Sequence, residues 1–172
     1  MIILGTYAPS PSSKDGPKYS PRGKEYNFAA VSPLSTSRVV NNWPGSMIFS
    51  GASLGGNITS GSRLSDSPAT SPVRAAYKWS VGCDTGGGSW DQVTMLYAVT
   101  GLGDTFRFGN RYGYNRVHWD GSNLWVLDPK VRNQKWIELA DGVSNTTVAA
   151  ILDGLYSILP SARRVPVSAA KP

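Results

Sequence analysis

Side chains that could carry catalysis are scarce in this chain of 172 residues. His118 is the only histidine, so a Ser-His-Asp triad would depend on it, and a metal site with several histidines cannot form. Cys83 is the only cysteine, which excludes an intrachain disulfide and a zinc site built from several thiolates. Glu25 and Glu138 are the only glutamates, and no pair of facing carboxylates of the kind that glycosidases need stands out. We therefore expect neither an enzyme nor a protein that depends on a cofactor or a metal.

One tripeptide, Asp84-Thr85-Gly86, has a catalytic-looking sequence. It resembles the active-site triplet of the aspartic proteases, in which two carboxylates share a proton because both cannot ionise at close range. A homodimer would supply the second aspartate. Those proteases have an apolar strand directly before the triplet and Ser or Ala after it, whereas here Gly82-Cys83 precede it and Gly87-Gly88 follow it. A glycine-rich hairpin loop is the preferred interpretation, and a dimeric aspartic peptidase is kept as an alternative.

Basic and aromatic residues alternate between Phe106 and Arg116. Because alternate side chains of a strand point to the same side, a strand here would place tyrosines and arginine on one face. Rings can stack on bases and a guanidinium can bind phosphate, and the same face could equally stack on sugars. In the competing interpretation the rings are core or subunit contacts, and the arginines pair with aspartates such as Asp104 and Asp120. The candidate residues for binding on this face are Arg111, Tyr112, Tyr114 and Arg116.

The formal net charge of +6 is carried by the two ends of the chain. Residues 1–38 hold five basic and two acidic side chains, residues 161–172 hold three basic and none acidic, and residues 39–160 hold nine of each. This distribution favours ends that reach an acidic partner, such as encapsidated nucleic acid or a partner subunit. The candidate contact residues are Lys14, Lys18, Arg22, Lys24, Arg163, Arg164 and Lys171.

The first 72 residues are rich in Ser, Pro and Gly, which argues against long helices. Aromatic residues are nevertheless spread through this stretch, and such rings need a surface to pack on. We therefore expect a long extended N-terminal arm that is ordered by packing on its own body or on a neighbouring subunit. Short strands are predicted at residues 2–7, 26–31, 38–41 and 47–49.

From Ala75 onward the pattern of apolar residues is typical of strands. Residues 75–81 and 93–99 alternate apolar and other side chains, the period of a half-buried strand, and the glycine-rich segment 82–91 would join them as a hairpin. The pair Asp120-Gly121 predicts a tight turn. Further strands are predicted at 105–108, 112–119, 124–127 and 134–139. The sequence thus predicts a mainly β fold, an antiparallel meander or sandwich-like sheet.

One amphipathic helix is predicted at residues 146–159. Val148, Leu152 and Leu155 recur at helical spacing, Ser144 or Asn145 can cap the first turn, and Pro160 ends the helix. The expected organisation is an arm over residues 1–72, a β body with this helix over 73–160, and a basic tail over 161–172.

In general layout the chain resembles a viral shell or tail component, and a β-meander followed by a helix resembles the coat proteins of single-stranded RNA phages. The hypothesis is a self-assembling virion structural protein, a phage coat, decoration or tail-associated subunit. Its partners would be copies of itself, other virion proteins and encapsidated nucleic acid. No membrane partner is expected, because no apolar run is long enough to span a bilayer. The rival is a carbohydrate-binding β-module that stacks sugars on Trp79, Trp90, Trp119, Trp125 or Trp136.

Overall fold

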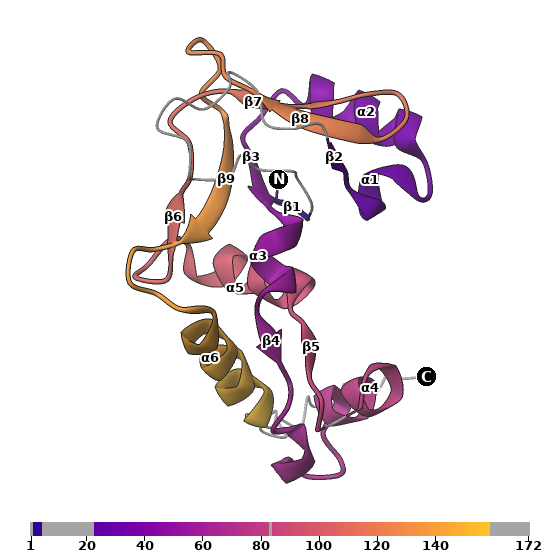
Figure 1. Cartoon of the computed structure of the whole chain (residues 1–172), viewed down its shortest axis with the longest axis vertical. Helices are drawn as coiled ribbons and strands as arrows, with labels where there is room; N and C mark the ends of the chain where they lie inside the picture. Colours follow the sequence, from indigo (N-terminus) through magenta and orange to yellow (C-terminus); the bar gives the residue numbers. More distant parts are fainter. Residues whose placement is uncertain (1, 5–22, 83, 159–172) are drawn as a thin grey trace, which may run out of the picture.

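The computed structural model describes residues 2–4, 23–82 and 84–158 (Figure 1). The described structure is 41% helical and 21% strand, with three small sheets. This content corrects the expectation of a mainly β chain, because the fold mixes helices and strands. Helices α1 (Tyr26–Ala29) and α2 (Pro33–Asn42) and one β-hairpin lie at one end of the long axis, and helix α4 (Pro72–Ser80) lies at the other.

The central sheet has four strands in the order β1 (Ile2–Leu4), β3 (Met47–Ser50), β9 (Gln134–Leu139) and β6 (Phe106–Phe108). β1 and β9 both run parallel to β3, and β6 runs antiparallel to β9. Three strands predicted from the sequence therefore exist with nearly the expected bounds. Their pairing differs, because neighbours in this sheet are far apart in the chain, so the expected meander is wrong. The remainder of the strand predicted at 2–7 lies outside the described residues.

The second sheet contains the one hairpin that the sequence located correctly. β7 (Tyr114–Val117) pairs antiparallel with β8 (Ser122–Val126), and β2 (Gly23–Lys24) adds to the other side of β8. Gly121 has φ 79°, which the tight turn requires and glycine permits. Asp120 supports the turn by accepting hydrogen bonds from the backbone N–H and the hydroxyl of Ser122. A third, two-stranded sheet pairs β4 (Thr59–Ser60) with β5 (Gly87–Gly88).

Two segments predicted as strands are helices. α4 covers residues 75–80 of the first, and α5 (Trp90–Thr100) covers the whole of the second. Ser71 accepts the Arg74 N–H at the start of α4 and Pro72 occupies its first turn, a combination that favours helix initiation. The expected hairpin loop at 82–91 instead links α4, β5 and α5.

The described part of the expected arm is also folded. It contains α1 (Tyr26–Ala29), α2 (Pro33–Asn42), α3 (Ala52–Gly56) and the 3-10 helix η1 (Leu64–Asp66). The strands predicted at 26–31 and 38–41 are therefore wrong, whereas the strand at 47–49 is confirmed. Residues 23–72 form helices and strands rather than an extended arm, because their apolar side chains pack into the body. Residues 5–22 lie outside the described part.

Two clusters of buried side chains flank the central sheet. The cluster toward α1, α2 and the hairpin contains Phe28, Val40, Met47, Phe49, Val117, Trp125 and Trp136. The cluster toward α5 and α6 (Asn145–Ser157) contains Ile58, Val93, Leu96, Phe106, Ile137, Val148 and Leu152. Each cluster combines residues from before and after position 72, so both parts of the chain contribute to both clusters.

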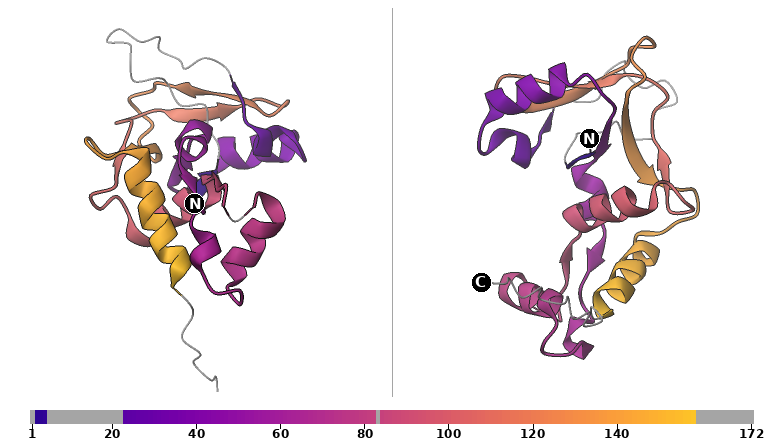
Figure 2. Two further views of the ribbon diagram at one scale, coloured as in Figure 1. Left: turned by 60° about the horizontal axis from the view of Figure 1, so that its bottom comes forward. Right: turned by 180° about the vertical axis from the view of Figure 1, so that it is seen from behind.

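Helix α6 confirms the helix predicted near the C-terminus. Ser144 is its N-cap and accepts a hydrogen bond from the Thr147 N–H at 3.0 Å. Val148 and Leu152 are buried, one turn apart, against the second cluster. In both views of Figure 2, α6 runs beside β4 at the α4 end of the molecule.

Candidate functional site

An apolar groove lies between α5 and α6. Its volume is about 470 Å³. Val99 is 77% exposed, Met95 is 63% exposed and Leu155 is 49% exposed. The groove is lined by Asp91, Gln92, Met95, Leu96, Val99, Thr100, Leu152, Leu155 and Tyr156. We call this surface the α5–α6 groove.

The groove is almost free of charge. Asp91 is the one charged residue among the described residues of its lining. Gln92 donates a hydrogen bond from Nε2 to the Tyr77 hydroxyl at 3.0 Å, so its amide is engaged toward the interior. α5 buries Val93 and Leu96 on one side and presents apolar side chains on the other, a pattern typical of helices that are covered on both sides. Within the described ranges, the outer side of α5 has no such cover.

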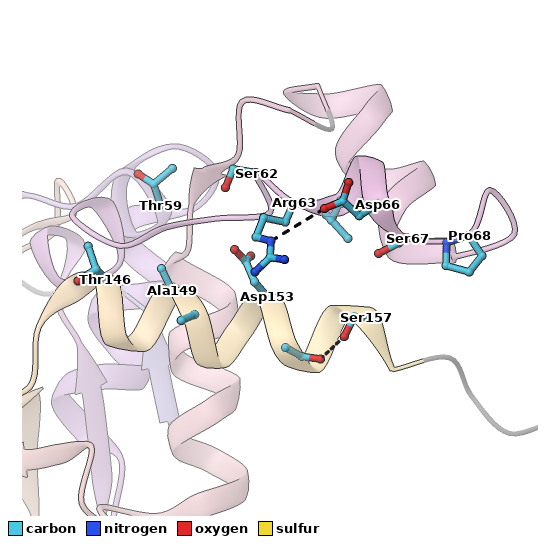
Figure 3. Close-up of a pocket in the computed structure, with 13 residues that line it drawn as sticks. Thr59, Ser62, Arg63, Asp66, Ser67, Pro68, Thr146, Ala149, Asp153 and Ser157 are labelled. Atoms are coloured by element: carbon cyan, nitrogen blue, oxygen red, sulfur yellow. Dashed lines mark hydrogen bonds and ion pairs between the residues drawn. The ribbon is translucent and has the colours of Figure 1, made fainter.

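A second cavity lies on another side of α6, between that helix and η1 (Figure 3). Its volume is about 510 Å³. Arg63 forms an ion pair with Asp66 at 4.0 Å and reaches over the cavity toward Asp153. Asp153 Oδ1 accepts the Gly61 N–H at 2.6 Å. The lining residues are Thr59, Ser62, Arg63, Leu64, Asp66, Ser67, Pro68, Thr146, Ala149, Ala150, Asp153, Gly154 and Ser157. We call this surface the η1–α6 cavity.

A network of buried hydroxyl groups lies between the two surfaces. The Oγ atoms of Ser60 and Ser89 are 2.7 Å apart, and both residues are fully buried. The Tyr156 hydroxyl is 3.1 Å from Ser60 Oγ and accepts a hydrogen bond from the Tyr77 hydroxyl at 3.2 Å. Burial raises the pKa of Tyr156 above its ordinary value, so the phenol stays neutral further into the alkaline range than a free tyrosine does. The network joins four elements and is suited to holding them together.

The residues predicted to bind on a sheet face are found on and beside β7. Tyr114 is half-buried and Arg116 is exposed, while Asn115 and Val117, which alternate with them along the strand, are buried, and this is the alternation that the sequence indicated. Arg111 and Tyr112 precede the strand and are exposed. Their proposed role in binding stays a prediction.

One arginine of the basic and aromatic stretch pairs with two acidic side chains that the sequence analysis did not name as partners. Arg107 pairs with Glu138 at 2.9 Å and with Asp141 at 3.5 Å. Asp120 accepts hydrogen bonds from Ser122 within its own turn. Phe106 is buried in the second cluster, so one ring of the basic and aromatic stretch is a core residue.

One candidate for nucleic-acid or acidic-partner contact lies in the described chain. Lys24 is exposed on β2. The other six, Lys14, Lys18, Arg22, Arg163, Arg164 and Lys171, lie outside the described residues.

The tryptophans divide into core and surface residues. Trp125 and Trp136 are buried, with ring centroids 4.6 Å apart, and Trp90 donates from Nε1 to the Ala52 carbonyl. Trp79 is 91% exposed on α4 and Trp119 is 76% exposed in the hairpin turn. These two elements lie at opposite ends of the molecule, so the two exposed rings cannot form a single platform (Figure 1).

Asp84 lies in an exposed turn between α4 and β5. A dimeric aspartic peptidase stays an alternative. Support for it would require a peptidase activity in the native chain that is lost in Asp84→Asn. Over residues 2–4, 23–82 and 84–158, no group of three or more His, Cys, Asp or Glu side chains could hold a metal ion. None of the helices in these ranges has the length and apolar character needed to span a bilayer.

Comparisons with known proteins give no family for this chain. It matches no protein-family model, no curated protein and no solved structure.

Sequence reasoning missed both surfaces, for different reasons. Met95 and Val99 were assigned to a strand, although Val93 and Leu96 also fit the helical i, i+3 spacing that could have placed them. Arg63, Asp66 and Asp153 carry no local pattern, because the cavity exists only where η1 packs near α6.

Proposed function

We propose that this chain is a self-assembling structural subunit that associates with copies of itself through the α5–α6 groove. The observation that carries the proposal is the exposure of Val99 and Met95 beside a hollow of about 470 Å³. Burying such a side chain fully contributes about 1.5–3 kcal/mol, so several of them favour association. Contiguous exposed apolar surface of this kind marks interaction sites in soluble proteins.

A second copy is a suitable occupant because a twofold interface places each patch against an identical patch. The apolar lining of one groove can then cover the apolar lining of the other. The charge distribution agrees with this. Residues 39–160 carry equal numbers of basic and acidic side chains, so two bodies can approach without net repulsion.

The finer proposal is that the assembly is a virion, with the chain as a phage coat, decoration or tail-associated protein. Its support is the charge excess at the chain ends, where residues 161–172 hold three basic side chains and no acid. An assembly that collects many such ends presents a concentrated positive charge to nucleic acid. The partners would then be copies of the chain, other virion proteins and encapsidated nucleic acid.

Light scattering coupled to size exclusion tests the coarser proposal. The native chain is expected to run as a dimer or larger species, and Val99→Asp as a monomer, because a buried carboxylate without a partner opposes association. Val31→Asp is the matched control, since Val31 is 91% exposed in the α1–α2 connection, away from the groove. A native chain that stays monomeric at high concentration, or a Val99→Asp chain with unchanged mass, would overturn the proposal.

The same experiment separates the finer proposal from simple dimerisation. A virion protein is expected to form large particles and to retain nucleic acid that is released by salt. A dimer with no bound nucleic acid would support the proposal of self-association and contradict the proposal of a virion role.

A carbohydrate-binding module is the second candidate, and it is favoured by the exposure of Trp79 and Trp119. Exposed indole rings stack on sugars, and each ring would act alone because the two are far apart. Retention of the native chain on a polysaccharide column, lost in Trp119→Ala or Trp79→Ala, would support this candidate. Absence of retention for the native chain would remove it.

A further inference from the structure

The η1–α6 cavity has an excess of negative charge. Among the described residues of its lining, Asp66 and Asp153 stand against a single cation, Arg63. The Arg63–Asp66 pair is long, at 4.0 Å, and the two side chains are 80% and 74% exposed, so this pair is weak and leaves Asp66 open to other cations. Asp153 uses Oδ1 for the Gly61 N–H, and a carboxylate can accept further hydrogen bonds through its other oxygen.

The walls of the cavity suit the aliphatic part of a long basic side chain. Ala149, Ala150 and Gly154 present little bulk on the α6 side, and Leu64 and Pro68 face them from the η1 side. Long basic side chains lay their methylene stems on apolar surface while the charged head reaches polar partners. The cavity therefore combines an apolar floor with carboxylates at its rim.

The chain leaves α6 at the edge of this cavity. Ser157 lines the cavity and is the last residue of α6. Arg163 is six residues further on, a distance of up to about 20 Å for an extended chain. Asp153 lies only about one helical turn before Ser157, so residues beyond α6 can reach it easily. A segment tethered so close has an effective concentration in the millimolar range for its own chain.

We infer that the η1–α6 cavity binds the chain's own C-terminal segment, residues 159–172, and that Arg163 or Arg164 pairs there with Asp66 or Asp153 beside Arg63. The segment carries three basic residues and no acid, which complements the carboxylates of the cavity. An arginine fork is suited to carboxylates because it can donate two parallel hydrogen bonds to one group. Two of the residues predicted to contact nucleic acid or an acidic subunit thus have an acidic partner within their own chain.

A pair of introduced cysteines tests the contact in the full chain. Ser62→Cys places a thiol on the exposed rim of the cavity, and Ala162→Cys places one beside Arg163, in a Cys83→Ser background. Cysteines bridge only when their Cα atoms come within about 7 Å, and docking of the segment brings the two thiols together. An intramolecular disulfide is therefore expected in dilute protein. Val31→Cys with Ala162→Cys is the control, and it should bridge much more slowly, because Val31 lies in the α1–α2 connection at the far end of the molecule.

Charge variants show whether the carboxylates hold the segment. Asp66→Asn with Asp153→Asn, or Arg163→Ala with Arg164→Ala, is expected to slow bridging about tenfold, since charge-assisted hydrogen bonds are lost. In Asp153→Asn the amide oxygen can still accept the Gly61 N–H, so the backbone contact is retained. Lys171→Ala, which removes a charge far from Ala162, should leave the rate almost unchanged.

The outcomes that would overturn the inference are distinct. Bridging no faster than the control pair would mean that the segment does not dock, and an intermolecular disulfide would mean that the occupant is a second copy. Bridging that is insensitive to the charge variants would remove the role of the carboxylates. Performing the experiment in a Val99→Asp background keeps the result independent of self-association through the α5–α6 groove.

Discussion

The hydroxyl of Tyr156 lies 3.1 Å from Oγ of Ser60, which is 96 residues earlier in the chain. This contact ties α6 to β4, and the Tyr77 hydroxyl joins the same pair from α4. Because α6 lines both the α5–α6 groove and the η1–α6 cavity, these hydroxyl groups help to fix the geometry of both surfaces.

We expect alkaline pH to destabilise the protein partly through Tyr156. Its pKa is raised in the folded state, chiefly by burial, so the stabilisation is complete below the ordinary tyrosine pKa of about 10 and is lost as the pH rises above that value. Tyr156→Phe removes this titration. The free energy of unfolding, measured in urea across this range, should fall less steeply with pH in Tyr156→Phe than in the native chain.

Near neutral pH, Tyr156→Phe should lower the free energy of unfolding by about 0.5–1.5 kcal/mol, because hydrogen bonds of the phenol are lost. Tyr26→Phe serves as the control, since Tyr26 is 77% exposed. Equal pH slopes for the native chain and Tyr156→Phe would contradict this role of burial.

Gly61→Ala should destabilise the protein more than Gly142→Ala. Both glycines have positive φ, 91° and 83°, so alanine is strained at either position. At Gly61 a Cβ would lie 2.2 Å from the Tyr77 ring, whereas at Gly142 it would meet nothing within 4 Å. The extra cost at Gly61 is expected to be about 1–3 kcal/mol, as for overpacking in a core. Denaturant midpoints of the two variants measure the difference, and equal midpoints would show that the Tyr77 contact is not tight.

Phe28→Ala tests whether residues 23–42 belong to the core. Phe28 is 3% exposed and lies in a cluster with residues of α2, β3 and the hairpin. Removing a buried phenylalanine typically costs about 3–5 kcal/mol. Tyr26→Ala truncates an exposed side chain two residues away, and it should change the free energy of unfolding by about 0.5 kcal/mol or less. A Phe28→Ala variant as stable as the native chain would contradict this core role and support the extended arm that the sequence predicts.

Local sequence signals located elements that are stabilised by their own residues. α6 has an amphipathic period and a Ser144 cap, and the β7–β8 turn has Asp120-Gly121, so each could be predicted from a short window. The starts of α2 and α4 also carried a signal, a serine directly before a proline, at Ser32-Pro33 and Ser71-Pro72. This signal was outweighed by the high Ser, Pro and Gly content and by the alternation of apolar residues after Ala75.

The scarcity of catalytic groups, the charge of the two chain ends, helix α6 and the short hairpin were all predictable, because they depend on composition or on residues close in the chain. That β1, β3 and β9 are parallel neighbours, and that Phe28 and Trp125 share a cluster, became visible only in the folded chain. The tertiary structure also brought Asp66 and Asp153 to one cavity. The physical reason is that such contacts join segments separated by many residues, and their free energy comes from burying surface that no local pattern specifies.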